Sequence, residues 1–379
     1  MDINFLLLAK NKWTFIAFCL NMRKLEKCPN TIIYTPVFLD ATCSGIQQLA
    51  ALIGEAELGV DVNLKSQEDS SIPGDIYTKL LIFINKEVQN LGKANPLYSS
   101  LSEINLTREI VKKPIMTKTY NTTVMGKKES ITNTVVTIKV GKQKLYGFLD
   151  KKGNIVLLTY REVLQIAKVI YGSIYIKYPG LKNIFDYLLS MIKAFNTLNI
   201  PMQWVTPAGV KRIQNYNKIL QNKISIYLGG KARKLVLQEY RDEMNKSKQS
   251  SAGIPNMIHS LDAAHNMILI KTISNVRFFT VITVHDCFGT HPNNISELNY
   301  LGLTEFIKLY TTHDFLNKFH HSYINVFKSF DLDIQEVKDK NGKTKTIVFS
   351  TDGRFKVIMP ENQKLVTWTL MKLKILNFL

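Results

Sequence analysis

Residues 31–54 have the sequence TIIYTPVFLDATCSGIQQLAALIG, which changes character in its middle. The first part, 31–39, is rich in β-branched and aromatic residues and favours a strand. After Asp40 the composition becomes that of a turn, and Ser44 can cap a helix over 46–53. The stretch therefore predicts a strand that ends at Asp40, directly before a turn and a helix.

A second β-rich run, 277–284, ends in the same way, at His285 and Asp286. Two carboxylates at the ends of neighbouring strands could hold two divalent cations about 3.5–4 Å apart, one activating an attacking hydroxyl and the other stabilising a leaving oxygen. Mg²⁺ suits such a site because it prefers carboxylate, phosphate and water oxygens. Asp40 and Asp286 are thus candidate metal ligands, although many Asp residues at strand ends only form turns.

Apolar spacing and turn signals predict the other elements. Helices are expected at 75–91, 159–178, 181–196, 255–271, 297–310 and 314–328. Strands are expected in a three-stranded meander over 130–159, at 203–209, and in a hairpin over 223–240 around Gly229 and Gly230. This mixture of elements indicates a mixed α/β (α+β) fold.

The segment 107–121 is basic. At helical spacing four of its residues would share one face: Arg108, Lys112, Met116 and Tyr120. Pro114 lacks an amide donor and would clash with the preceding turn, so it predicts a kink or a helix start. Cations beside a triphosphate neutralise its developing charge, which makes Arg108, Lys112 and Lys113 candidate substrate contacts. A solvated basic helix face is the alternative.

The 379-residue chain carries 49 Lys and Arg against 30 Asp and Glu, so its formal charge is 49 − 30 = +19. Apolar residues make up 45% of the chain, which excludes a disordered tail, a collagen and a low-complexity linker. The excess positive charge suggests a polyanionic partner, with nucleic acid the first candidate and a membrane surface the second.

The four cysteines include no C-x-x-C pair, which argues against a zinc knuckle and for a reducing compartment. The apolar runs near the N-terminus are too short to span a bilayer, and no signal or transit pattern is present, so we expect neither secretion nor a membrane span. The abundance of Ile, Asn and Lys suggests an AT-rich genome, such as that of an organelle or its plasmids.

Four segments, in order, resemble the single-subunit RNA polymerases of bacteriophages, mitochondria and organellar plasmids. Residues 40–47 (DATCSGIQ) are similar to the first palm motif, and 108–120 (REIVKKPIMTKTY) to the fingers motif. Residues 248–262 contain KQ, GIPN and HSLD, and 284–290 (VHDCFGT) resemble the second palm motif. The resemblance covers about 13–330 and implies a right-hand polymerase with palm and fingers.

The resemblance implies that Asp40 and Asp286 are the catalytic carboxylates and bind two Mg²⁺ ions. It implies that Lys112 contacts the incoming triphosphate, with Arg108 and Lys113 beside it.

The resemblance further implies that Tyr120 lies at the ribose and the template base, and that His259 holds this tyrosine and the ribose 2′-hydroxyl. A site that hydrogen-bonds a hydroxyl rejects the analogue that lacks it. The related DNA polymerases place Glu five residues after the first Asp, whereas this chain has Gly45, which leaves room for the hydroxyl. They also tend to have His-Asp-Glu where this chain has His285, Asp286 and Cys287. We therefore expect RNA synthesis, with Gly45 and His285 among the substrate contacts.

The hairpin over 223–240 lies where the family carries a promoter-reading hairpin. A two-stranded ribbon can enter the major groove, so Lys231, Arg233 and Lys234 near its tip are candidate DNA contacts. A surface hairpin that touches only phosphates is the alternative.

By resemblance, 1–104 form the first part of the palm, 105–258 the fingers with the meander and the hairpin, and 259–379 the second part of the palm with the C-terminal helices. The family's N-terminal domain and thumb are expected to be missing. Asn121 replaces the Gly of the phage pattern, but Asn tolerates left-handed backbone. The tail after about 355 matches poorly, and only Phe378 hints at the family's aromatic C-terminal foot.

We therefore expect a truncated copy of a DNA-directed RNA polymerase that extends RNA 5′ to 3′ in the mitochondrion or from a plasmid. Its expected partners are a DNA template, nascent RNA, nucleoside triphosphates, and a transcription factor or a missing N-terminal polymerase fragment, with no membrane. The alternative is a catalytically dead remnant that binds nucleic acid through its charge.

Overall fold

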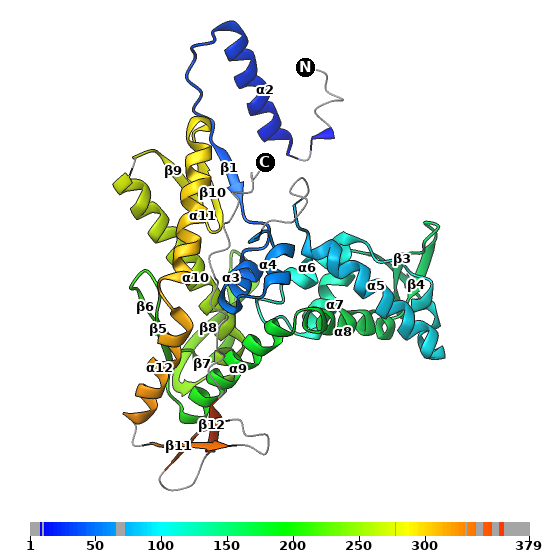
Figure 1. Ribbon diagram of the computed structural model, residues 1–379. Helices are drawn as coiled ribbons and strands as arrows, with labels where there is room; N and C mark the ends of the chain where they lie inside the picture. Colours follow the sequence, from blue (N-terminus) through cyan, green and yellow to red (C-terminus); the bar gives the residue numbers. More distant parts are fainter. Residues whose placement is uncertain are drawn as a thin grey trace.

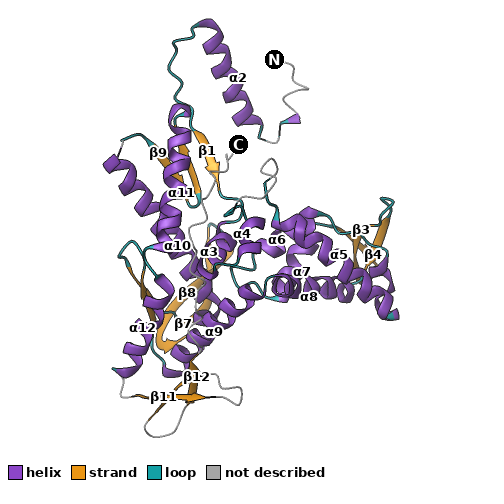
Figure 2. Cartoon of the chain, in the orientation of Figure 1, coloured by secondary structure: helices purple, strands orange, loops and turns teal. Residues whose placement is uncertain are grey.

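The computed structural model describes residues 8–9, 11–65, 73–276, 278–329, 332–338, 344–350 and 356–359. Phe378 and most of the tail after 355 lie outside these residues, as does Arg277. Within them the chain is a mixed α+β structure, with many helices and several small antiparallel sheets (Figures 1 and 2). The predicted mixed fold class is therefore confirmed at this level, and the sheets are antiparallel where they are described.

The sheet that matters most for function joins the two predicted strand ends. Strand β1 (Val37–Asp40) pairs antiparallel with β10 (Cys287–Thr290), which pairs in turn with β9 (Val281–Val284). Asp40 lies opposite Cys287, and Cys287 lies opposite Val284, so His285 and Asp286 form a two-residue turn. The strand predicted over 31–39 is shorter than expected, because it begins only after Pro36, which has no amide donor for a ladder.

Helix α3 (Ser44–Ile53) follows β1, as the sequence predicts, and its residues from Gly45 to Ile53 are all buried. It packs against α9 (Pro179–Leu198) and α10 (Lys246–Val276). Ser44 is not the N-cap. The cap position belongs to Cys43, and the Ser44 hydroxyl instead donates to Asp262 on α10 at 2.9 Å, a partner 218 residues away that local sequence cannot reveal.

An arm of helices extends to the right in Figure 1. It contains α5 (Ile76–Ala94), the 3₁₀ helix η1 (Pro96–Ser102), α6 (Arg108–Met116), α7 (Val124–Thr132) and α8 (Tyr160–Lys177). The predicted meander, β2 (Val136–Val140), β3 (Gln143–Leu149) and β4 (Ile155–Leu158), is confirmed near the far end of this arm. The residues at 130–132, predicted as strand, belong to α7.

Helix α6 corrects the prediction for the basic segment. It begins at Arg108 rather than at Pro114, which lies in its last turn, where the missing donor costs one hydrogen bond. The helix ends at Met116, and 117–121 form a tight turn in which Asn121 has φ +54°. Tyr120 is therefore not on the helical face of Arg108 and Lys112.

The second half of the chain begins with two hairpins: β5 (Met202–Val205) with β6 (Lys211–Gln214), and β7 (Asn217–Leu228) with β8 (Lys231–Met244). Gly229 and Gly230 both have positive φ in the turn between β7 and β8, as a two-residue hairpin favours. Helix α10 begins at Lys246, nine residues before the predicted start, and α11 (Ile295–Thr311) and α12 (Phe315–Lys328) follow as predicted. Other elements are α2 (Lys12–Lys27), α4 (Ala56–Asp61), η2 (Pro292–Asn294), β11 (Leu332–Lys338), β12 (Thr344–Ser350) and β13 (Lys356–Met359).

One large apolar core joins α3, α5, α8, α9, α10 and α12, and includes Leu49, Ile84, Ile166, Phe195 and Tyr323. A smaller cluster, formed by Leu269, Ile273, Phe279, Leu298 and Leu301, lies between α10, α11 and the sheet that carries Asp40. Helix α10 thus contributes to both clusters, whereas α3 packs in the large core alone. None of the helices in the described part of the chain combines the length and apolar character that crossing a bilayer requires.

Candidate active site

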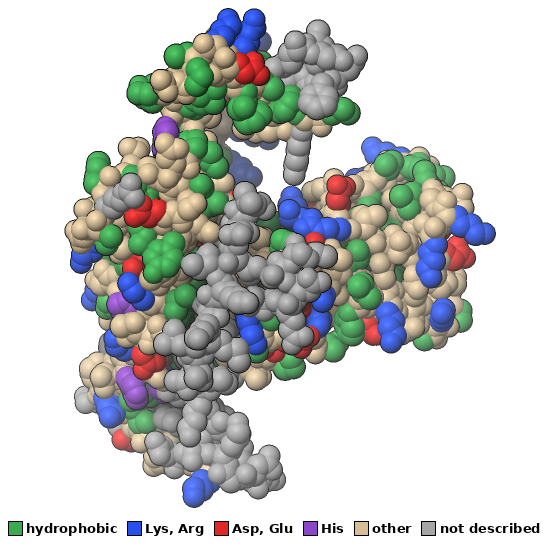
Figure 3. Space-filling model, turned by 45° about the horizontal axis from the view of Figure 1, so that its top comes forward, with side chains coloured by type: hydrophobic (Ala, Val, Ile, Leu, Met, Phe, Trp, Pro, Cys, Tyr) green, Lys and Arg blue, Asp and Glu red, His purple; other side chains and the backbone are tan. Residues whose placement is uncertain are grey.

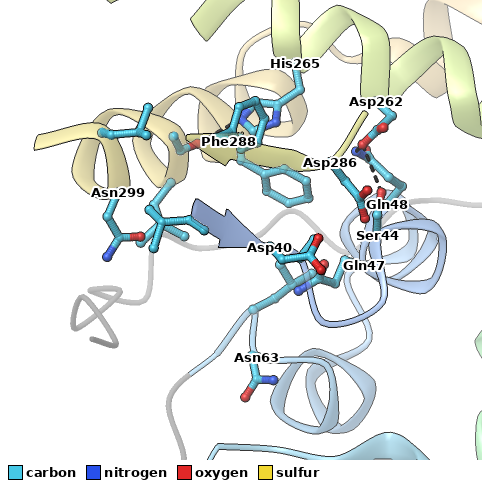
Figure 4. Close-up of a pocket in the computed structure, with 17 residues that line it drawn as sticks. Asp40, Ser44, Gln47, Gln48, Asn63, Asp262, His265, Asp286, Phe288 and Asn299 are labelled. Carbon is cyan, nitrogen blue, oxygen red and sulfur yellow. Dashed lines mark hydrogen bonds between the residues drawn. The ribbon is translucent and has the colours of Figure 1, made fainter. Parts of the chain in front are cut away.

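Asp40 and Asp286 lie side by side, one at the end of β1 and the other in the turn before β10. Figure 4 shows both carboxylates pointing into the same space, with Asp262 of α10 close to Asp286. All three line one pocket of about 110 Å³ together with Ser44 and Gln48. The antiparallel pairing of β1 and β10 therefore brings together the two carboxylates that the sequence singled out.

The electrostatics of this pocket suit a cation. Burial raises the pKa of Asp286, and the negative charges of Asp262 and Asp40 raise it further. A divalent cation between these groups would offset that repulsion. Among the described residues there is no group of three or more His, Cys, Asp or Glu side chains that could hold a metal ion on its own. Mg²⁺ commonly binds through one or two carboxylates plus substrate phosphates and water, so Asp40 and Asp286 fit this ion.

Tyr120 and His259 also meet, although they come from different parts of the chain. Their ring centroids are 5.2 Å apart at an interplanar angle of 50°. Both line a second pocket of about 490 Å³, the tyrosine pocket, which they share with Gly45, His285 and Asp286. Burial raises the pKa of Tyr120, and the charges of Asp286 and Asp262 add to this shift.

Gly45 has a packing role that the sequence did not suggest. A Cβ at this position would lie 2.7 Å from Oγ1 of Thr119, the residue before Tyr120. Glycine therefore lets α3 approach the turn that carries Tyr120.

The basic residues of α6 lie beside Tyr77 of α5. The Arg108 Nε donates to Asp75 at 2.7 Å, and its guanidinium carbon lies 5.3 Å from the centre of the Tyr77 ring. The Lys112 ammonium lies 5.8 Å from the same ring. Lys112 and Lys113 are exposed and have no ion-pair partner in the described part of the chain. These two cations are therefore available to an anionic ligand, whereas Arg108 is already paired.

Comparison with known proteins identifies the family of the chain. A family model described as DNA-dependent RNA polymerase matches residues 2–374. The chain belongs to the single-subunit DNA-directed RNA polymerase family. It is 37% identical over 351 residues to a probable DNA-directed RNA polymerase of Gelasinospora sp. (strain G114). The matched region covers 90% of this chain and 41% of that protein.

More distant polymerases of the family match as well. The chain is 32% identical over 314 residues to a probable DNA-directed RNA polymerase of Neurospora crassa, covering 81% of this chain and 35% of that protein. It is 25% identical over 309 residues to the mitochondrial DNA-directed RNA polymerase of Homo sapiens, covering 80% of this chain and 24% of that protein. The chain thus spans about two fifths or less of the length of these relatives.

Three basic residues at the tip of the β7–β8 hairpin, Lys231, Arg233 and Lys234, line neither pocket. All three are exposed. Side chains alternate between the two faces of a strand, so Lys231 and Arg233 share one face and Lys234 lies on the other.

Three polar residues around the site were not predicted as site residues: Asp75, Asp262 and Asn266. Asp75 caps α5 and holds Arg108. Asp262 and Asn266 lie on α10, one and two turns after His259. Their spacing from His259 along a helix was the available signal, because residues three, four and seven apart share a face.

Proposed function

We propose that this chain is the catalytic portion of a DNA-directed RNA polymerase, which adds ribonucleotides to RNA in the 5′ to 3′ direction on a DNA template. This proposal rests on the observation that Asp40 and Asp286 face one another while Tyr120 and His259 line the adjoining tyrosine pocket. Two carboxylates beside a substrate pocket are what phosphoryl transfer requires.

In this proposal each residue acts on a defined part of the substrates. Asp40 and Asp286 would hold Mg²⁺, which supplies the Lewis acidity for attack of an RNA 3′-hydroxyl on a triphosphate. Lys112 and Lys113 would neutralise triphosphate charge, with Arg108 joining when it leaves Asp75.

The ribose end of the substrate would lie in the tyrosine pocket. There the pair of Tyr120 and His259 would face the sugar and discriminate ribose from deoxyribose, beside Gly45 and His285.

The chain would divide as the sequence suggests, with a first palm part at 1–104, fingers at 105–258 and a second palm part at 259–379. The exposed β7–β8 hairpin would contact DNA through Lys231, Arg233 or Lys234. Lys and Arg side chains are spread over the visible face in Figure 3, which suits a polyanionic template. A transcription factor or a further polymerase fragment would be an additional partner.

A second candidate is a remnant that binds nucleic acid without polymerising. The observation that favours it is coverage, because the chain spans 41% of the Gelasinospora relative. Its charge of +19 would persist in such a remnant and would still attract nucleic acid.

The test is extension of a primed RNA–DNA scaffold with Mg²⁺ and labelled ribonucleotides, run beside an Asp286→Ala variant. Extension by the wild-type chain alone supports polymerase activity. Salt-sensitive scaffold binding by both chains, with extension by neither, supports the remnant.

We also propose a mitochondrial location, because the Homo sapiens relative is named as mitochondrial and the composition suggests an organellar or plasmid gene. Fractionation of the source cells with an antibody against the chain tests this. A signal confined to another compartment would reject it.

A further inference from the structure

Helix α10 presents a row of polar side chains to the candidate active site. His259, Asp262 and Asn266 are three and four residues apart, so they lie on one face of this helix. All three line the tyrosine pocket together with Asp286. Each of them contacts a different segment of the site, and the contact of His259 is with Tyr120.

Asp262 holds the helix that follows Asp40. Its Oδ1 accepts a hydrogen bond from Ser44 Oγ at 2.9 Å and another from Gln48 Nε2 at 3.3 Å, and both donors lie on α3. The Gln48 Oε1 in turn accepts from the Tyr310 hydroxyl on α11. Because Ser44 is the first residue of α3, these bonds fix the point where the chain leaves Asp40 and enters the helix.

Asn266 holds the turn that carries Asp286. Its Nδ2 donates to the His285 carbonyl oxygen at 2.6 Å. His285 has φ +55°, a left-handed conformation that is unfavourable for a residue with a Cβ and persists only where neighbours enforce it. The Asn266 Oδ1 is buried and has no hydrogen-bond partner within the described chain. The side chain is therefore fixed by its contact with the peptide that leads into Asp286.

We propose that Asp262 and Asn266 are positioning residues, through which α10 acts as a rigid frame that sets the separation of the Asp40 and Asp286 carboxylates. Asp262 acts on the Asp40 side through α3, and Asn266 acts on the Asp286 side through the His285 carbonyl. The inference rests on the proposed function in one respect, namely that the two carboxylates bind a divalent cation together.

If α10 sets the separation of the carboxylates, loss of its contacts should weaken metal binding by a measurable factor. Residues that orient metal ligands without touching the metal typically change metal affinity about 10- to 100-fold when they are mutated. Removing the Asn266 amide leaves both carboxyl groups in the chain but removes the hydrogen bond that holds the strained turn before Asp286. We therefore expect the Asn266→Leu variant to bind Mn²⁺ about tenfold more weakly than the wild type, as measured from the free-ion signal by electron paramagnetic resonance.

The same helix offers a matched control. Asn256 also donates through its Nδ2, to Gln214 Oε1 at 3.1 Å and to the Tyr216 hydroxyl at 3.0 Å, and it lines neither pocket of the site. Asn256→Leu therefore makes the same chemical change on the same helix away from the carboxylates. It should leave Mn²⁺ affinity at the wild-type value, and thermal unfolding of both variants shows whether either has lost its fold.

Asp262 needs a different design, because removing its charge would weaken cation binding on its own. A double-mutant cycle with Ser44→Ala and Asp262→Ala isolates the contact from the charge, because alanine offers no oxygen to accept the Ser44 hydrogen bond. If the hydrogen bond between them positions Asp40, the two changes should be non-additive in Mn²⁺ affinity. Additive effects would overturn the role of Asp262.

Hydrogen exchange supplies a readout that needs neither metal nor catalysis. Peptides covering 281–290 should exchange faster in Asn266→Leu than in the wild type and in Asn256→Leu. The wild-type chain could fail to extend RNA while Asn266→Leu still differs from the wild type and from Asn256→Leu in Mn²⁺ affinity and in exchange. That result would reject the proposed polymerase activity and support the positioning role of α10. A folded Asn266→Leu variant with wild-type exchange in this hairpin would overturn the frame, whether or not the chain binds Mn²⁺.

Discussion

At the scale of single residues, Gly45 gives the sharpest steric prediction. The Cβ of a Gly45→Ala variant would lie 2.7 Å from Thr119 Oγ1 and 3.0 Å from Thr119 Cβ, so the turn before Tyr120 must move. Overpacking of this kind costs about 1–3 kcal/mol. We expect urea unfolding to show a loss of that size, together with weaker discrimination against deoxyribonucleotides.

Gly172 is the matched control for this change, because it lies in α8 with nothing within 4 Å of an added Cβ. Gly172→Ala should stabilise the chain by about 0.5–1 kcal/mol, since Ala favours a helix. Equal effects of the two substitutions would show that Gly45 is not held against the turn.

Lys118, two residues before Tyr120, gives a prediction about pH. Its side chain is 2% exposed, and its ammonium lies 3.3 Å from the Tyr171 ring centre, with Lys127 close by. Burial, with the Lys127 charge adding to it, lowers the pKa of Lys118 to about 7. Between pH 7 and 10 the unfolded chain therefore binds more protons than the folded chain, so stability should rise with pH.

The measurement is the free energy of unfolding between pH 7 and 9. Lys118→Met should flatten its rise with pH, leaving a smaller slope from Lys127, whose pKa burial lowers to about 8. Lys128, which lies 4.5 Å from the Tyr160 ring centre and is less buried, is the control, and Lys128→Met should retain the wild-type slope. A wild-type curve that is flat or falling over this range would contradict the expectation.

At the scale of elements, the β7–β8 register divides the hairpin into two unlike faces. The pairs Ile224 with Leu235 and Ile226 with Arg233 belong to a mostly apolar face that also carries Lys231. Lys223, opposite Val236, and Lys234, opposite Ser225, lie on the other and more polar face. Phosphate contact favours this polar face.

We therefore expect the double variant Lys223→Gln and Lys234→Gln to lose about two phosphate contacts. The slope of log binding constant against log salt concentration should fall in magnitude by about two, because each contact contributes about one. Fluorescence anisotropy of a labelled duplex across a salt series measures this slope. The matched variant Lys231→Gln and Arg233→Gln makes the same charge change on the apolar face. A larger loss from this second pair would reverse the assignment of the faces.

The same comparison of elements shows what the sequence could and could not predict. The meander, α8, α9 and the β7–β8 hairpin were predicted because apolar period and turn glycines are local signals. The turn at 117–121 was not predicted, because the sequence is equally compatible with a helix that continues from Arg108 to Tyr120. Its geometry depends on Thr119 meeting Gly45, a tertiary contact between segments more than 70 residues apart in the chain.

For the site, Asp40 and Asp286 could be predicted because each follows a β-rich run and matches a motif. Asp262 and Asn266 share a helical spacing with His259, but their roles could not be assigned, since their partners Ser44 and His285 lie in other segments. Long-range hydrogen bonds of this kind appear only once the elements are packed together.

At the scale of the whole molecule, the positive charges and the candidate catalytic carboxylates lie in different parts of the chain. The excess of 19 positive charges is carried by residues spread along the chain, whereas the candidate chemistry depends on two carboxylates in one sheet. Release of counterions from nucleic acid depends on the cations, so the salt dependence of scaffold binding should be independent of the catalytic pair. Asp40→Asn and Asp286→Asn should therefore abolish extension and keep the wild-type salt slope between about 50 and 200 mM.

This prediction separates the two functional candidates with one pair of measurements. A polymerase loses extension in both variants and keeps its slope, while a remnant shows the same slope in all three proteins and no extension in any of them. A slope that changes with either Asp substitution would mean that the carboxylates shape the nucleic-acid surface itself. The separation of binding from catalysis would then be wrong, because Asp286 lies in the same turn as the strained His285 and could move it.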